Sequence, residues 1–249
     1  MTAATNPKRN ELLATLPAAA WVRLSANMEP VELRLGEVIY ESGAPQPYVY
    51  FPTDSIISLL FVMTNGDSAE IAIVGNEGLV GIALFMGGGT TPSRAVVQSG
   101  GSAFRVKAKY LRNEFEHAGA LQEVLLRYTQ ALVTQMGQTA VCNRHHSLEQ
   151  QFCRWLLMSL DRLPSNELSM TQELIANMLG VRREGVTEAA GRLQNAGVIS
   201  YSRGRITVLD RPRLEKLSCE CYEVVRQEFA RLLPWAPLPT KASAAQRHR

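Results

Sequence analysis

The 249-residue chain has no long apolar segment and few cysteines. No apolar run approaches the roughly 18 residues that a membrane-spanning helix needs, and the amino-terminal MTAATNPKRNELL lacks an apolar signal region. These absences predict a cytoplasmic protein with no membrane partner. Its four cysteines, Cys142, Cys153, Cys219 and Cys221, suit a reducing compartment and exclude a disulfide framework.

Common catalytic and metal-binding patterns are also missing. The chain has no recognisable nucleophile–base–acid arrangement, no phosphate-binding Walker loop and no metal-hydrolase motif, so we expect no enzyme. Cys219-Glu220-Cys221 offers too few ligands, too close together, for a closed tetrahedral site. His145-His146 has no visible partner residues, which favours ordinary polar or capping roles. The sequence therefore predicts no metal site.

Charge is distributed unevenly along the chain, although the formal net charge is only +3. Residues 1–120 hold 9 Lys or Arg and 11 Asp or Glu, whereas residues 169–213 hold 7 Lys or Arg and 4 Asp or Glu. A positive carboxyl-terminal segment suits a polyanionic partner such as DNA.

Two apolar stripes at helical spacing lie within residues 169–199, with Gly180 between them. They consist of Leu174, Ile175, Met178 and Leu179, and of Val186, Ala189, Ala190 and Leu193. Thr171 can cap the first helix and Gly197 ends the second, which is typical of a helix-turn-helix. Two β-branched runs around Arg203-Gly204-Arg205 predict a hairpin with a basic tip. A winged helix-turn-helix is favoured over a subdomain that only packs, since the basic residues gather where DNA would lie.

Short strands and a long helix are expected before this motif. From Val31, apolar and polar residues alternate in short runs between turns, among them Asn65-Gly66-Asp67, which predicts a β sandwich or barrel after a partly helical start. From Ala120, apolar residues recur at intervals of 4, 3 and 4 residues, which predicts a coiled-coil seam. A single packed helix would also explain the wide apolar face. The predicted seam consists of Leu121, Leu125, Tyr128 and Leu132. Amphipathic helices are expected over 147–163 and 214–233.

The order of these segments resembles a known family. LGEVIYESG at 35–43, YVYF at 48–51, Gly66-Asp67 and GNEGLVG at 75–81 resemble the β-roll of the Crp/Fnr family of bacterial transcription regulators. TQELIA at 171–176 and LGVRREGV at 179–186 resemble its helix-turn-helix, and the matches together cover about residues 20–215.

The resemblance implies an α+β fold with a double-stranded, jelly-roll-like β-roll, a long dimerisation helix and a winged helix-turn-helix. Expected boundaries are 1–117 for the β-roll sensor domain with its amino-terminal helix, 118–146 for the dimerisation helix and 147–233 for the DNA-binding domain. Residues 234–249 are expected to be a disordered tail. The implied function is that of a homodimeric regulator of transcription, with palindromic double-stranded DNA and RNA polymerase as partners.

In the family, an Arg-Glu pair early in the second helix reads base edges, and Arg183-Glu184 fall on that pair. Glu188 stands where a second Arg is common, so the half-site is expected to differ from the family's best-known sequences. The predicted DNA-binding residues are Thr171, Gln172, Arg182, Arg183, Glu184, Thr187, Glu188, Arg192, Ser202, Arg203 and Arg205. Glu188 also supports the alternative of a sensing or adaptor protein of the same fold that binds DNA weakly.

Cyclic-nucleotide members of the family hold the phosphate with a Gly-Glu and an Arg-Ser or Arg-Thr. In this chain, Glu77 is displaced by one residue from the family's Gly-Glu, and Ser93-Arg94 has the reverse order of the family's Arg-Ser. A displacement of one residue along a strand turns the side chain to the other face of the sheet. Another small ligand, or none, is therefore favoured over a cyclic nucleotide. Candidate ligand-binding residues are Glu77, Gly78, Leu79, Val80, Ser93, Arg94 and Ala95.

No cysteine precedes Cys142 and no histidine precedes His117, which excludes the family's amino-terminal iron–sulfur cluster and a β-roll haem.

Overall fold

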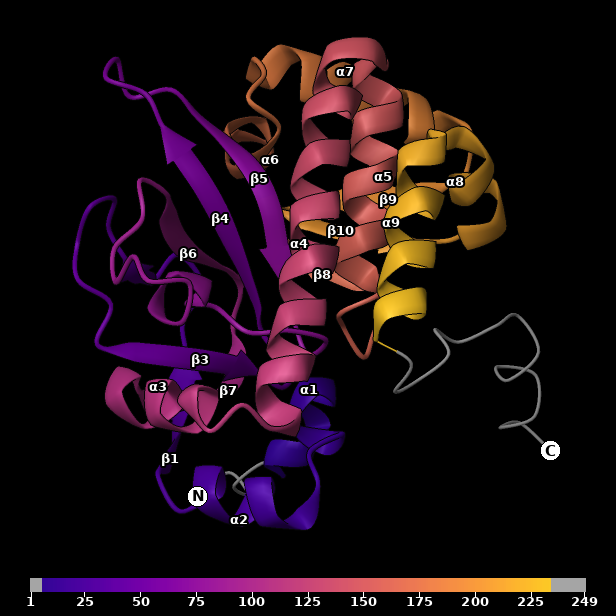
Figure 1. The fold of residues 1–249 in the computed structure, drawn as a ribbon. Coiled ribbons are helices and arrows are strands. Elements are labelled where there is room, and N and C mark those ends of the chain that lie inside the picture. The colour runs from indigo at the N-terminus through magenta and orange to yellow at the C-terminus, as the bar shows by residue number, and fades with distance from the viewer. Residues whose placement is uncertain (1–5, 234–249) are drawn as a thin grey trace, which may run out of the picture.

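Alternating short strands form a two-sheet β-roll in the amino-terminal half of the computed structural model, which describes residues 6–233 (Figure 1). The strands are β1 (Met28–Leu33), β2 (Val38–Tyr40), β3 (Tyr48–Pro52), β4 (Ile56–Val62), β5 (Ser68–Val74), β6 (Arg94–Ser99) and β7 (Gly101–Lys107). One sheet has the order β1-β7-β3 and the other β2-β6-β4-β5, with antiparallel pairing throughout. Phe51, Ile57 and Val106 are fully buried in the core between them.

Short helices flank the β-roll. They are η1 (Pro7–Arg9), α1 (Glu11–Ala14), α2 (Ala18–Ser25), η2 (Ile82–Leu84) and α3 (Ala108–Glu116). Helices α1, α2 and α3 lie at the lower end of the β-roll in Figure 1. Asn10 caps α1 and is itself fully buried. Its amide Nδ2 donates to the carbonyl oxygens of Pro52 at 2.9 Å and Gly78 at 2.8 Å, so the amino-terminal helices are fixed to the end of β3 and to the loop after β5.

The long helix α4 (Ala120–His145) runs along the β-roll, and its predicted seam faces inward. Leu121, Leu125, Tyr128 and Leu132 are at most 2% exposed and belong to the β-roll core of the same chain. The Tyr128 hydroxyl donates to the Leu79 carbonyl oxygen at 2.9 Å. The assignment of these four residues to a dimer seam is therefore wrong. Their spacing defined an apolar face, but the protein's own sheet covers that face.

The carboxyl-terminal domain contains α5 (Leu148–Leu160), β8 (Glu167–Ser169), α6 (Gln172–Leu179), α7 (Arg183–Asn195), β9 (Ile199–Ser202), β10 (Arg205–Val208), α8 (Arg211–Leu217) and α9 (Glu220–Leu232). Its strands form a small sheet in the order β8-β10-β9. Ser147 and Gln150 form a capping box at the start of α5. Ile56, Leu60 and Ile73 of the β-roll belong to the same hydrophobic cluster as α5, so the two domains share a core.

The single helix expected over 214–233 is wrong, because the chain breaks at Ser218 and restarts with Cys219 as the amino-terminal cap of α9. Helix α9 then lies against α4 (Figure 1). The expected tail, 234–249, falls outside the described residues. Within residues 6–233, no helix is both long and apolar enough to cross a bilayer.

A buried polar network joins the β-roll to α5. The Ser58 hydroxyl lies 2.5 Å from Glu70 Oε2 and 2.9 Å from Gln98 Oε1, and Gln98 Nε2 donates to Ser159 Oγ at 2.8 Å. Burial raises the pKa of the Glu70 carboxyl to about 8, because the charged form loses its hydration. Strands β4, β5 and β6 are thus tied to the first helix of the DNA-binding domain.

Candidate functional site

The helix-turn-helix forms at the expected residues. Thr171 Oγ1 accepts from the Leu174 backbone N–H at 3.3 Å and caps α6, as its sequence position predicted. Gly180 follows α6 with φ of +65°, a conformation that favours glycine. A Cβ at Gly180 would also lie 3.1 Å from the Ala69 Cβ, so this turn packs closely against β5.

Helix α7 divides into a buried face and an exposed face. Val186, Ala189, Ala190 and Leu193 are buried, as their helical spacing predicted. The exposed residues at its amino-terminal end and along its outer face are Arg182, Arg183, Glu184, Thr187 and Glu188. Thr187 Oγ1 donates to Gln172 Oε1 at 2.8 Å, which fixes α7 against α6. Arg183 and Glu184 therefore project from the first turn of a helix whose position is fixed from behind.

A two-residue turn connects β9 to β10. Arg203 and Gly204 have φ of +51° and +76°, as a type I′ hairpin turn requires, and Arg203 is exposed at the tip. Tyr201 supports the hairpin from behind by donating its hydroxyl to the Met170 carbonyl oxygen at 2.8 Å. The wing and the two helices enclose a groove of about 460 Å³, lined by Thr171, Gln172, Glu173, Arg183, Tyr201, Ser202, Arg203 and Gly204.

The predicted basic residues differ in their partners. Arg192 pairs with Glu149 at 2.6 Å and, more distantly, with Glu188, four residues before it on α7, at 3.9 Å. Arg205 lies 3.9 Å from Glu167. In the part of the chain that the structure describes, Arg182, Arg183 and Arg203 have no ion-pair partner. These three guanidinium groups are the ones available to a polyanion.

Gly185 lies inside α7 for a packing reason. A Cβ there would come within 2.7 Å of Leu148 Cδ2, so glycine lets the start of α5 pack directly on α7. The contact with α5 therefore accounts for a glycine at this helical position.

The first half of the candidate ligand site packs against helices. Glu77 accepts from Arg162 Nε at 2.8 Å, and both side chains are largely buried. A Cβ at Gly78 would lie 2.4 Å from the Tyr128 ring, so α4 rests directly on this loop. Leu79 and Val80 are buried in the β-roll core.

The second half has other neighbours. Ser93 is 5% exposed and lies 3.5 Å from the Tyr40 hydroxyl and 3.1 Å from Thr91 Oγ1. Arg94 Nε lies 3.1 Å from Glu41 Oε2 at the edge of the sheet, and Ala95 is fully buried. Glu77 is thus paired with Arg162, and Arg94 is paired with Glu41. The two residues do not come together at one site for an anion.

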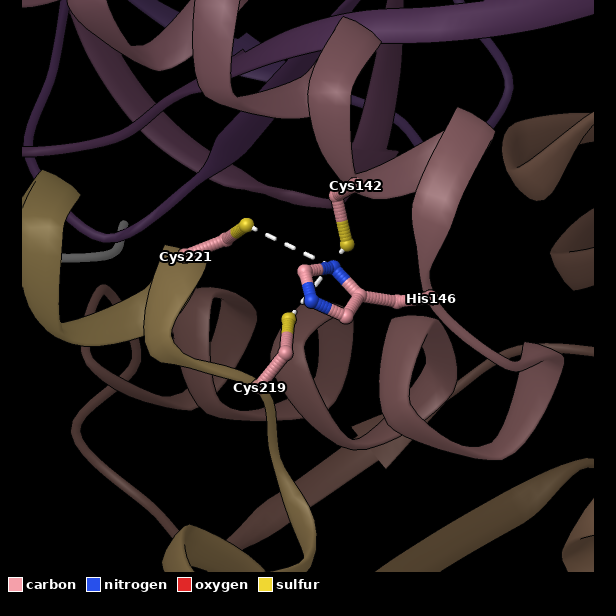
Figure 2. A group of neighbouring side chains, drawn as sticks. All are labelled: Cys142, His146, Cys219 and Cys221. Carbon is pink, nitrogen blue, oxygen red and sulfur yellow. Dashed lines mark hydrogen bonds between the residues drawn. The ribbon is translucent and has the colours of Figure 1, made fainter.

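The sequence interpretation missed a cluster of sulfur and nitrogen ligands (Figure 2). Cys142, His146, Cys219 and Cys221 place one ligand atom each within 4.8 Å of all the others. The sequence interpretation counted only Cys219 and Cys221, whereas the carboxyl-terminal end of α4 brings Cys142 and His146 beside them. The usable signal was the spacing of Cys142 and His146, which puts both on one helix face. The hydrogen bond between Cys142 and Cys219 lowers the pKa of the Cys219 thiol.

Family comparisons match both halves of this fold. Residues 30–118 match the model of the cyclic nucleotide-binding domain, and residues 150–217 match that of the Crp-like helix-turn-helix domain. No curated protein sequence matches the chain at a significant level.

Several solved structures share the fold. A Crp/Fnr family regulator from Eubacterium rectale is 18% identical with a TM-score of 0.64, over 84% of this chain and 98% of that one. FixK2 from Bradyrhizobium japonicum is 17% identical with a TM-score of 0.63, over 77% and 98%. A Crp/Fnr family regulator from Thermus thermophilus is 22% identical with a TM-score of 0.62, over 76% and 98%. The two matched domains, in this order and on this fold, make the chain a member of the Crp/Fnr family of transcription regulators.

Proposed function

We propose that this chain is a sequence-specific DNA-binding regulator that acts as a homodimer on a palindromic operator. The observation that carries the proposal is the set of three exposed guanidinium groups without carboxylate partners in the described residues, at the start of α7 and at the wing tip. Arg183 and Arg203 line one groove, and Arg182 is the N-cap residue of α7 beside it. The helix dipole at this end of α7 also attracts phosphate.

Base reading is assigned to two side chains. Arg183 contacts guanine through two hydrogen bonds in the major groove, and Glu184 accepts from cytosine N4. Phosphate contacts are assigned to Arg182 and to Arg203 at the wing, with polar support from Thr171, Gln172 and Ser202. Arg192, Arg205 and Glu188 contribute indirectly, since each is engaged in an ion pair within the protein.

The dimer contact is assigned to the exposed face of α4. Leu126, Val133 and Val141 are 53%, 57% and 47% exposed, and Ala140 shares their face. Positions 126, 133 and 140 repeat every seven residues, which is the heptad spacing of a two-stranded coiled coil. A Cβ at Gly137 would meet nothing within 4 Å, so a second helix can approach closely there. Two copies joined along this stripe would present two α7 helices to half-sites about 34 Å apart.

The β-roll is proposed to act on α4. Tyr128 on α4 packs on Gly78 and donates to the Leu79 carbonyl oxygen, so any ligand that displaces this loop also moves the helix. The side-chain partners of Glu77 and Arg94 support a role in holding the end of α5 and the sheet edge more than a role in holding a cyclic nucleotide. RNA polymerase remains a proposed partner through the family.

Selection of bound sequences from a random duplex pool tests the function. We expect enrichment of a palindrome, and Kd values that rise steeply with salt because the protein releases counterions from phosphates. Arg183→Ala should relax selection at one base pair per half-site and cost about 1–3 kcal/mol of discrimination. Arg231→Ala on α9 removes the same charge away from the groove and serves as the control. Uniform binding of all duplexes by the wild-type protein, or none, would contradict the proposal and favour the adaptor alternative.

A further inference from the structure

We propose that Cys142, His146, Cys219 and Cys221 bind one zinc ion in a closed tetrahedral Cys3His site. Cys142 Sγ lies 3.5 Å from Cys219 Sγ, and Cys221 Sγ lies 3.6 Å from His146 Nδ1. With zinc–sulfur bonds of about 2.3 Å, the edge of a sulfur tetrahedron is about 3.8 Å. The observed spacings therefore suit a single ion, whereas a multi-iron cluster must separate its thiolates more widely to hold several metal atoms.

Two helix ends bring the ligands together (Figure 2). Cys142 lies in the last turn of α4 and His146 is the C-cap residue directly after the helix, and their spacing of four residues brings both side chains to one side. Cys219 caps the amino-terminal end of α9 and Cys221 lies in its first turn. The helix dipole at this end favours thiolates, the form that a metal binds. The break between α8 and α9 thus gives the Cys219 side chain its position.

The surroundings supply a carboxylate for the histidine. His146 Nε2 lies 3.3 Å from Glu220 Oε2, while Nδ1 lies 3.6 Å from Cys221 Sγ. A metal-binding histidine commonly directs its second ring nitrogen to a carboxylate, which fixes the ring orientation and the tautomer.

A buried arginine balances the charge. Zinc with three thiolates and a neutral histidine carries one net negative charge, after the ion has displaced the thiol protons to solvent. Arg154 is 5% exposed, and its guanidinium donates to Thr139 Oγ1 at 2.9 Å. It also interacts electrostatically with Cys142 and Cys221. A buried cation near two of the thiols would offset the negative charge of the metal complex.

The site would connect α9 to the end of α4, directly before α5 begins at Leu148. Metal binding would therefore fix the joint through which the β-roll and α4 meet the DNA-binding domain. The inference about the metal does not depend on DNA binding. Its effect on DNA binding does rest on the proposed function, so metal content and DNA affinity have to be measured separately.

Metal analysis of the full chain tests the inference. Protein purified under reducing conditions with zinc, then dialysed against a weak chelator, should retain about one zinc per chain. Cobalt should replace it and give the intense d–d absorption of a tetrahedral site with thiolate charge transfer. Cys219→Ser should lose at least tenfold in zinc affinity, whereas Cys153→Ser removes a buried cysteine outside the cluster and should keep it. Circular dichroism confirms that each variant folds.

Glu220→Gln keeps all four ligands and should weaken zinc binding about tenfold or more through the histidine, even where Cys219→Ser fails to fold. Absence of both zinc and cobalt from the reduced wild-type protein would overturn the inference. So would equal metal content in Cys219→Ser and Cys153→Ser, iron in place of zinc, or a Cys142–Cys219 disulfide in protein prepared with zinc and reductant.

Discussion

Arg203 combines an unfavourable backbone conformation with an exposed charge. Its φ of +51° lies in the left-handed region, which costs an ordinary residue roughly 1–2 kcal/mol. Asn-Gly is the preferred pair for this turn, yet the chain has Arg-Gly. A costly side chain at the tip of a wing is explained when the guanidinium binds something outside the protein, and a DNA phosphate fits.

Arg203→Asn is therefore expected to separate stability from binding. The free energy of unfolding should stay equal or rise by up to about 1 kcal/mol, because asparagine tolerates the turn. DNA affinity should fall about equally for all sequences, and the slope of log Kd against log salt should decrease by about one. Denaturant titrations and fluorescence anisotropy at several salt concentrations measure the two effects. An unchanged salt slope would remove Arg203 from the interface.

Helix α4 has two apolar faces in different environments. The face with Leu125 and Tyr128 is buried by the β-roll of the same chain, and the face with Leu126 and Val133 is exposed. The buried face repeats at intervals of three and four residues and the exposed face at intervals of seven. Both spacings suit a coiled coil, so the periodicity alone could not tell which face remains for a second copy.

Val133→Glu should convert the proposed dimer to a monomer, because a carboxylate buried in a helix pair without a partner is strongly destabilising. Thr134→Glu adds the same charge about 100° around the helix and should leave the dimer intact. Light scattering coupled to size-exclusion chromatography gives the mass of each variant. A dimeric Val133→Glu protein would place the dimer contact elsewhere.

For the whole molecule, the shared core and the Glu70 network couple the β-roll to the DNA-binding domain. The pKa of the Glu70 carboxyl is about 8 in the folded protein, whereas the ordinary value for a glutamate is 4.5. Between pH 4.5 and pH 8 the folded state therefore holds one proton more than the unfolded state. Stability conferred by the neutral carboxyl is fully present below about pH 4.5. It is lost as pH rises toward 8, by up to about 1.4 kcal/mol per pH unit.

Glu70→Gln should remove this pH dependence, because glutamine stays neutral in both states. Denaturant unfolding at pH 5, 6, 7 and 8 should show the variant gaining on the wild-type protein as pH rises. Glu116→Gln, at an exposed position on α3, is the control and should follow the wild-type slope. Parallel stability profiles for wild type and Glu70→Gln would show that Glu70 is ionised in the folded protein.

Local signals made much of this protein predictable. Thr171, Gly180 and the stripe from Val186 to Leu193 define two helices and a turn through interactions a few residues apart, and the structure confirms them. The β-roll strands followed from alternation and turn residues for the same reason. Local preference, however, does not decide which partner covers an apolar face or meets a polar group.

Tertiary structure alone decided the remaining features. It buried Tyr128 under its own sheet, left Val133 exposed, and brought Cys142 to Cys219 across 77 positions of the chain. The break before α9 also depends on its packing against α4, because the apolar spacing by itself continued through it. Short-range sterics and hydrogen bonds let the sequence determine local conformations, whereas contacts between distant segments depend on how the whole chain excludes water.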